Sequence, residues 1–186
     1  DKKLIVQIKD LLSDNHLGDD NAKLTINLIS ISGLLKNSRL RMSGGVTGDS
    51  GIGKNNIIEA NIKHLPEGAC IYVSSATQST LEDDIKDKRI VAFKEVNFQR
   101  EDGANKHLLE VWKQLVEGGT KSLKKDIRTG YKTSRFEEGE QKTTLYPTTE
   151  AERNPEAETR VIFISINSDF ERIKKVNENT LDDFSD

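Results

Sequence analysis

The stretch GDSGIGKNN, which runs from Gly48 to Asn56, decides how the fold is interpreted. It follows the pattern G-x-x-x-x-G-K, in which glycines let backbone N–H groups wrap a phosphate and the lysine adds a positive charge. The pattern carries meaning between a strand and a helix. A strand is predicted over Arg39–Thr47 and a helix from about Asn55 to His64. We therefore expect a phosphate-binding loop, with an ordinary glycine-rich turn as the alternative.

The residue after Lys54 departs from the usual pattern. A Ser or Thr there normally places its hydroxyl on Mg²⁺, but this chain has Asn55, and Asn56 brings no hydroxyl either. The Asn55 carbonyl oxygen is a ligand that Mg²⁺ accepts, although the side chain is one atom longer and Mg²⁺ demands regular octahedral geometry. ATP binding should therefore survive better than hydrolysis. The expected nucleotide contacts are Gly48, Asp49, Ser50, Gly51, Ile52, Gly53, Lys54, Asn55, Asn56 and, later in the chain, Thr148.

Composition limits the class of protein. The chain has 186 residues, of which 34% are hydrophobic and 32% charged, and its net charge is −3. This length fits one domain with a real core, and the charge does not by itself indicate nucleic-acid binding. The lone Cys70 is expected to be a buried small residue in a reducing compartment, and the three histidines lack zinc-ligand spacing. With no long apolar run and no signal-peptide core, we expect a cytoplasmic protein without membrane contact.

Short apolar strands alternate with helices along the chain. Strands are expected in Ala69–Ser75, Arg89–Lys94, Thr143–Tyr146 and Arg160–Asn167, with a helix over Asn105–Glu117. This alternation predicts an α/β fold, a three-layer P-loop NTPase sandwich with a mainly parallel sheet. Further helices are expected at Lys3–Leu12, at Ala22–Lys36 (with Asp20 or Asn21 as its cap), within 77–88 and at about Asp169–Val176. The expected organisation is an N-terminal helical segment (1–36), a P-loop ATPase domain (37–178) with a polar β-hairpin insert (119–142), and a tail (179–186).

A carboxylate at the end of a second strand would complete an ATPase site. The run RIVAFKEVN ends in Lys94-Glu95, where such enzymes usually carry Asp-Glu. Glu95 is the candidate base that polarises the attacking water and, with Asn55, the candidate support of Mg²⁺. The alternative is an exposed carboxylate at the end of a strand. Lys94 in the first slot adds to the doubt about metal binding that Asn55 raises.

Later polar residues have candidate roles near the γ-phosphate. Thr148 or Thr149 follows a predicted strand and could lie beside that phosphate, or could simply belong to a turn around Pro147. Arg160, or less favourably Arg153, could reach a phosphate of the same or a neighbouring subunit, or form a surface salt bridge. With Lys54 and Glu95, Arg160 makes up the catalytic set that the sequence suggests.

These segments, in this order, resemble the ATPase domain of phage- and plasmid-type replication proteins, primase-associated helicases near the AAA+ and superfamily-three groups. The resemblance extends over roughly Ile31–Ile173 and rests on GVTGDSGIGKNNIIEA, EGACIYVSSATQSTLEDD, KRIVAFKEVN, LVEGGTKSLKKD and NPEAETRVIFISIN. It implies ATP and Mg²⁺ as cofactors, DNA as the partner, a ring-shaped homo-oligomer, and a primase or origin-binding domain in a longer chain. It also implies that the insert contacts DNA phosphates through Lys121, Lys124, Lys125 and Arg128, and the alternative for this cluster of cations is a solvated loop.

Three functions therefore compete. The first is an ATP-hydrolysing motor domain that translocates on DNA. The second is a nucleotide-binding scaffold with little or no hydrolysis, which Asn55 and Lys94 together suggest. The third, a small-molecule P-loop kinase, is weaker, because the NPEAET segment is acidic and no basic lid is evident.

Overall fold

The structure of the protein is a computed structural model. It describes residues 2–13, 18–73, 84–94, 103–118, 122–126, 130–134, 140–149 and 159–166. The expected helix at 169–176, the tail at 179–186 and most of the expected helix within 77–88 lie outside these residues. Within the described ranges, no helix is both long enough and apolar enough to cross a membrane.

Two N-terminal helices form where the sequence predicts them, α1 (Lys2–Ser13) and α2 (Asp20–Ser32). They are joined through Lys23, which is fully buried. Its Nζ atom donates to Ser13 Oγ at 2.8 Å and lies 3.2 Å from the Asp20 carboxylate. The expected side-chain cap is wrong: the N-cap residue is Asp19 in the left-handed region (φ 51°), and its side chain makes no capping bond.

Five strands form one parallel sheet in the order β2-β3-β6-β1-β7. They are β1 (Gly44–Thr47), β2 (Cys70–Val73), β3 (Ile90–Phe93), β6 (Thr143–Thr148) and β7 (Ile162–Ser165). The sequence therefore gives the correct class, α/β with a parallel sheet. β1 lies inside the sheet, between β6 and β7.

Two strand boundaries differ from the expected ones. β1 starts at Gly44 rather than Arg39, because Ser38–Leu40 forms a 3₁₀ turn (η1) in which Asn37 accepts from the Arg39 N–H. β6 continues past Pro147 to Thr148 instead of turning there. Pairing with β3 ends at Leu145, so Pro147 has only β1 beside it and its missing N–H costs no bond to β3.

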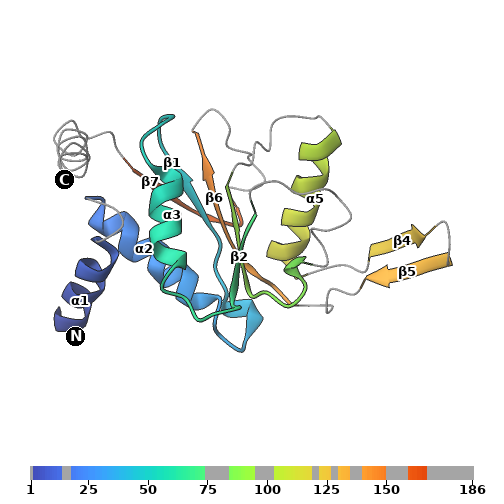
Figure 1. Ribbon diagram of the computed structural model, residues 1–186, viewed down its shortest axis with the longest axis horizontal. Helices are drawn as coiled ribbons and strands as arrows, with labels where there is room; N and C mark the ends of the chain where they lie inside the picture. Colours follow the sequence, from blue (N-terminus) through green and yellow to red (C-terminus); the bar gives the residue numbers. More distant parts are fainter. Residues whose placement is uncertain are drawn as a thin grey trace, which may run out of the picture.

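Helices cover both faces of the sheet. On one face α2 and α3 (Lys54–Ile62) pack onto apolar side chains such as Val46, Leu145 and Ile164. On the other face α5 (Gly103–Glu117) packs onto the sheet through Trp112, whose Nε1 donates to Thr144 Oγ1 at 3.1 Å. Figure 1 shows the resulting layers. Because α2 shares the core of the sheet, the N-terminal segment is packed into the domain.

The predicted hairpin insert is present between α5 and β6. Its strands, β4 (Ser122–Asp126) and β5 (Gly130–Ser134), pair antiparallel and form a two-stranded sheet separate from the main one. Figure 1 shows the hairpin extending from the body near the end of the sheet at which β6 begins, whereas the loop after β1 lies at the opposite end.

Candidate phosphate-binding site

The loop Gly48–Gly53 joins the carboxyl end of β1 to the start of α3, as the motif requires. Three glycines, Gly48, Gly51 and Gly53, have positive φ angles of 154°, 82° and 91°, which favour glycine. Gly53 is the N-cap of α3 and has no side chain that could cap the first N–H groups of the helix. Such an uncapped N-terminus attracts anions through its N–H groups and its dipole.

Gly48 is also required by packing. A Cβ atom at this position would lie 2.2 Å from Ile52 Cδ1 and 2.7 Å from the Ile166 carbonyl oxygen. A side chain would therefore push the loop away from the residue that follows β7. Around Gly51, by contrast, no heavy atom lies within 4 Å of such a Cβ.

Lys54 folds back across the loop. Its Nζ atom donates to the carbonyl oxygens of Gly48 at 2.7 Å and of Asp49 at 2.6 Å. These bonds hold the ammonium beside the start of the loop, where the motif requires the positive charge. Of the other predicted contacts, Asp49, Ser50 and Asn56 are exposed, which leaves them accessible to a ligand.

Asn55 carries a buried polar atom, Oδ1. This atom accepts no hydrogen bond from any residue that the structure describes. A buried carbonyl oxygen without a donor is costly, so this atom is a candidate acceptor for a ligand group or a cation. Amide oxygens are among the ligands that hard divalent cations take, so the chemistry of Asn55 fits Mg²⁺. This orphaned atom could not be identified from the sequence, because it depends on how the first turn of α3 packs.

Hydroxyl side chains line the strand ends under the loop. Thr47 is paired in register with Thr148 of β6 on one side and with Ser165 of β7 on the other. The Thr47 and Ser165 hydroxyl oxygens lie 3.1 Å apart, and Thr47 and Thr148 are both buried. Thr148 is therefore next to the strand that carries the loop. Sequence reasoning selected Thr148 but not Thr47 or Ser165, which only the strand order brings together.

The strand expected to carry the catalytic carboxylate, β3, is not adjacent to β1 in the sheet. β6 lies between β1 and β3. With about 4.8 Å between neighbouring strands, the ends of β1 and β3 are about 10 Å apart. Lys94 follows β3 and is exposed, with its N–H donating to the Val73 carbonyl at 2.8 Å. Glu95 lies outside the described residues, as do Arg153 and the segment around it.

Arg160 lies at the other end of the sheet. It precedes the first residue of β7, whereas the loop follows the last residue of β1, and these strands are parallel. Its Nη2 lies 2.5 Å from Glu117 Oε1 at the end of α5. Arg160 is therefore not brought together with Lys54 within one chain, and the contact it makes is the surface salt bridge that the sequence offered as the alternative.

The register of the hairpin places two lysines opposite each other. Lys124 pairs with Lys132, and Lys125 pairs with Tyr131. Like charges at directly opposite positions destabilise an antiparallel pair of strands. Lys132 was not among the predicted DNA contacts, because the register was not evident from the sequence. Lys121 and Arg128 lie outside the described residues.

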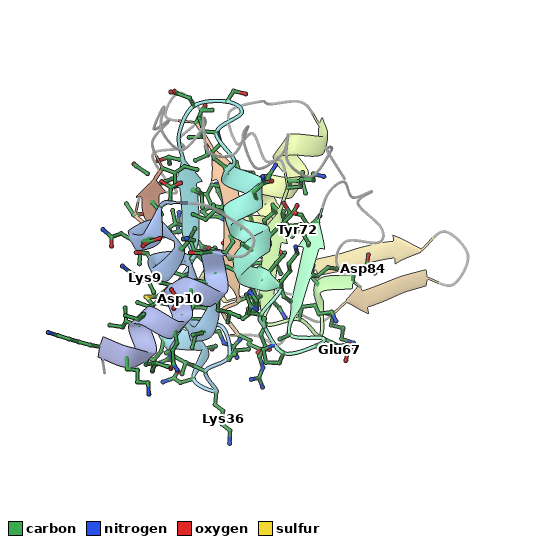
Figure 2. The ribbon with its side chains drawn as sticks, turned by 60° about the vertical axis from the view of Figure 1, so that its left-hand side comes forward. Lys9, Asp10, Lys36, Glu67, Tyr72 and Asp84 are labelled. Atoms are coloured by element: carbon green, nitrogen blue, oxygen red, sulfur yellow. The ribbon has the colours of Figure 1, made fainter. Side chains whose placement is uncertain are left out.

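Two further groups have perturbed acidities away from the loop. Burial raises the pKa of the Cys70 thiol to about 11, although an Ala92 backbone hydrogen bond and the Lys88 charge lower it in part. Burial and the nearby negative charge of Glu59 raise the pKa of Tyr72, which Figure 2 shows on β2 facing α3. Among the described residues, no three His, Cys, Asp or Glu side chains gather as a metal site would require.

Comparisons with known proteins add no family assignment. No protein-family model matches the chain, and a search of curated proteins finds no similar sequence. The candidate site therefore rests on the motif, the position of the loop in the sheet and the contacts of Lys54 and Asn55.

Proposed function

We propose that the chain is an ATP-binding P-loop domain, the motor of a DNA-dependent ATPase of the replication-helicase type. The observation that carries the proposal is the Lys54 ammonium, held across the Gly48–Gly53 loop at the N-terminus of α3. Anionic ligands of open parallel sheets bind beyond the carboxyl ends of the strands, where neighbouring strands connect in opposite directions. β1 and β6 are neighbours in the sheet. The chain runs from β1 to β2 at one edge of the sheet and from β6 to β7 at the other edge, so the two connections run in opposite directions.

The residues around the loop have separate roles in this proposal. The loop amides and Lys54 bind the phosphates, with Asp49, Ser50 and Asn56 at the exposed rim. Thr148, on the strand between β1 and β3, offers its hydroxyl toward the γ-phosphate, which a water attacks. Glu95 accepts a proton from that water. Asn55 and Glu95 would hold Mg²⁺, which would neutralise charge on the phosphates when bound.

The partner contacts of the proposal rest on the hairpin and on Arg160. Lys124 and Lys132, opposed across β4 and β5, favour a polyanion such as DNA. Arg160, at the end of β7 away from the loop, suits an arginine supplied to a neighbouring subunit. We propose a ring of identical subunits, because in a ring Arg160 of one subunit would face the nucleotide of the next and the hairpins would contact the same DNA.

A second candidate function has an observation in its favour. Asn55 replaces the hydroxyl residue, and Lys94 stands where a metal-supporting carboxylate is usual. Both differences weaken metal support rather than phosphate binding. They favour a nucleotide-binding scaffold in which ATP controls assembly and is hydrolysed slowly or not at all.

Phosphate release from Mg-ATP, measured with and without single-stranded DNA, separates the two candidates. We expect release that DNA stimulates, loss of release in Lys54→Ala, and faster release in Asn55→Thr. Lys63→Ala is the matched control, since Lys63 is an exposed lysine at the other end of α3. ATP binding with no release from either the natural chain or Asn55→Thr would favour the scaffold.

A further inference from the structure

The hairpin leaves and rejoins the body around one polar cavity. This cavity has a volume of about 380 Å³ and is lined by residues that include Arg41, Glu117, Gln141, Lys142 and Arg160. Glu117 is the last residue of α5, from which the chain continues toward β4. Gln141 and Lys142 come just before β6, where the chain returns from β5. The cavity therefore lies where both ends of the hairpin meet the sheet.

The returning end of the hairpin is held by buried contacts. The Arg41 side chain is only 2% exposed, and its Nη1 donates to Glu140 Oε1 at 2.9 Å and to the Gln141 carbonyl at 2.7 Å. The Lys142 N–H donates to the Leu115 carbonyl at 2.8 Å, and its buried ammonium donates to the carbonyls of Lys86 and Lys88. Such buried, multiply bonded charges are costly to separate from their partners.

The departing end is held differently. Glu117 bonds to Arg160 across 2.5 Å, and these side chains are 50% and 28% exposed. An ion pair this accessible to water contributes little stability and exchanges partners readily. A phosphate competes well with a carboxylate for a guanidinium group, because it offers more charge and a matching geometry. The departing end is therefore the one that a ligand can release.

We propose that Glu117 is a positioning residue that holds Arg160 in a resting state and ties it to the base of the hairpin. When Arg160 turns to the phosphate of a nucleotide on a neighbouring copy, Glu117 is released and the last turn of α5 loosens. The base of the hairpin is then freed on its departing side, after α5, while its returning side stays held at residues 140–142 by Arg41 and by the Lys142 ammonium. The release step rests on the proposed function; the contact between Glu117 and Arg160 does not.

Hydrogen exchange of backbone amides, measured on the full chain, tests this proposal without relying on ATP hydrolysis. The reporters are the amides of Gly118 and Lys142, which donate to Gln114 and Leu115 of α5. Glu117→Gln should raise exchange of the Gly118 amide about twofold to fivefold while leaving strands β1 and β6 unchanged. Exchange of the Lys142 amide should change less than that of the Gly118 amide. Glu110→Gln is the matched control, because Glu110 is exposed on the same helix.

A nucleotide arm tests the release step. Saturating ATP should raise Gly118 exchange in the natural chain, and Lys54→Ala should abolish that response but leave the effect of Glu117→Gln intact. Unchanged exchange in Glu117→Gln overturns the proposal. It is also overturned if ATP binds by direct titration, the copies associate, and Gly118 does not respond. Failure of ATP to bind would instead contradict the proposed function, and the Glu117→Gln comparison would still decide whether the contact holds the hairpin.

Discussion

At the scale of single residues, the candidate site depends on three neighbours in the chain, Gly53, Lys54 and Asn55. Gly53 starts α3 without a capping side chain, Lys54 crosses the loop, and Asn55 buries an oxygen without a hydrogen bond. The first two arrangements could be expected from the motif, because glycine spacing and helix termini have fixed physical consequences. The third could not, because a buried unpaired atom depends on its surroundings.

The steric role of Gly48 gives a first prediction. Gly48→Ala should destabilise the protein by about 1–3 kcal/mol, because its Cβ would overlap Ile52 and the Ile166 backbone. Gly51→Ala, which has open space but also a positive φ, should cost only about 1 kcal/mol. Urea unfolding followed by the fluorescence of Trp112 measures both. Equal costs would mean that backbone strain, rather than packing, requires glycine at position 48.

The raised pKa of Cys70 gives a prediction about pH. The neutral thiol is favoured in the folded state, with a pKa of about 11, whereas an unfolded thiol has a pKa of about 8.5. The resulting stability is fully present below about pH 8.5 and is lost as the pH rises toward 11. Other groups also titrate there, so the natural chain should be compared with Cys70→Ala at pH 8 and pH 10. An identical loss of unfolding free energy in both would contradict the role assigned to this thiol.

At the scale of elements, the sequence predicted which segments form strands but not the order of these strands in the sheet. The apolar run of β3 identifies a buried strand, because a strand covered on both faces needs apolar residues throughout. The apolar run of β7 suggested the same, but β7 lies at the edge of the sheet and its Ile162 and Ser165 are exposed. Strand order leaves no such signal, so the insertion of β6 between β1 and β3 was not predicted. The extension of β6 through Pro147 was missed for a related reason, since it depends on where pairing with β3 stops.

Packing of α5 on the sheet can be tested at Trp112. This side chain is fully buried, donates to Thr144 Oγ1, and meets the Tyr146 ring edge-on at a centroid distance of 5.9 Å. Trp112→Phe keeps much of the apolar contact but leaves the Thr144 hydroxyl without its donor. We expect a loss of about 1–3 kcal/mol of unfolding free energy, measured by circular dichroism during urea unfolding. Trp112→Ala should lose more unfolding free energy, about 3–5 kcal/mol in total, because it also leaves a cavity.

The register of the hairpin predicts how strongly DNA binding depends on the salt concentration. If Lys124 and Lys132 each contact a phosphate of single-stranded DNA, replacing both with Ser should reduce the slope of log K against log salt by about 1.4. Lys36→Ser is the control, because Lys36 is exposed and projects from the body away from the hairpin (Figure 2). DNA binding with an unchanged salt slope in the hairpin variant would place the DNA elsewhere on the molecule.

At the scale of the whole molecule, the loop and Arg160 lie at opposite ends of the parallel sheet. The sequence suggested both residues but could not say whether one chain brings them together. The strand directions answer that question, because β1 and β7 are parallel and their carboxyl ends coincide. If both residues act on one nucleotide, the complete site forms between two copies.

Mixing two inactive variants tests this shared site. Lys54→Ala keeps Arg160, and Arg160→Ala keeps the loop, so neither variant alone should release phosphate. In an equal mixture, about one interface in four combines an intact loop with an intact arginine, and about a quarter of the natural activity should return. No recovery in mixed assemblies, confirmed as mixed by mass, would contradict an arginine supplied by a neighbour.

The central claim, that Gly48–Asn56 binds the phosphates of ATP, is tested most directly by calorimetric titration of ATP into the chain. We expect a Kd in the micromolar range. Affinity should fall at least about tenfold in Lys54→Ala, because a phosphate then loses its charge-assisted partner, and should not change in Lys63→Ala. Absence of binding in the natural chain, or equal binding in Lys54→Ala, would contradict phosphate binding by this loop.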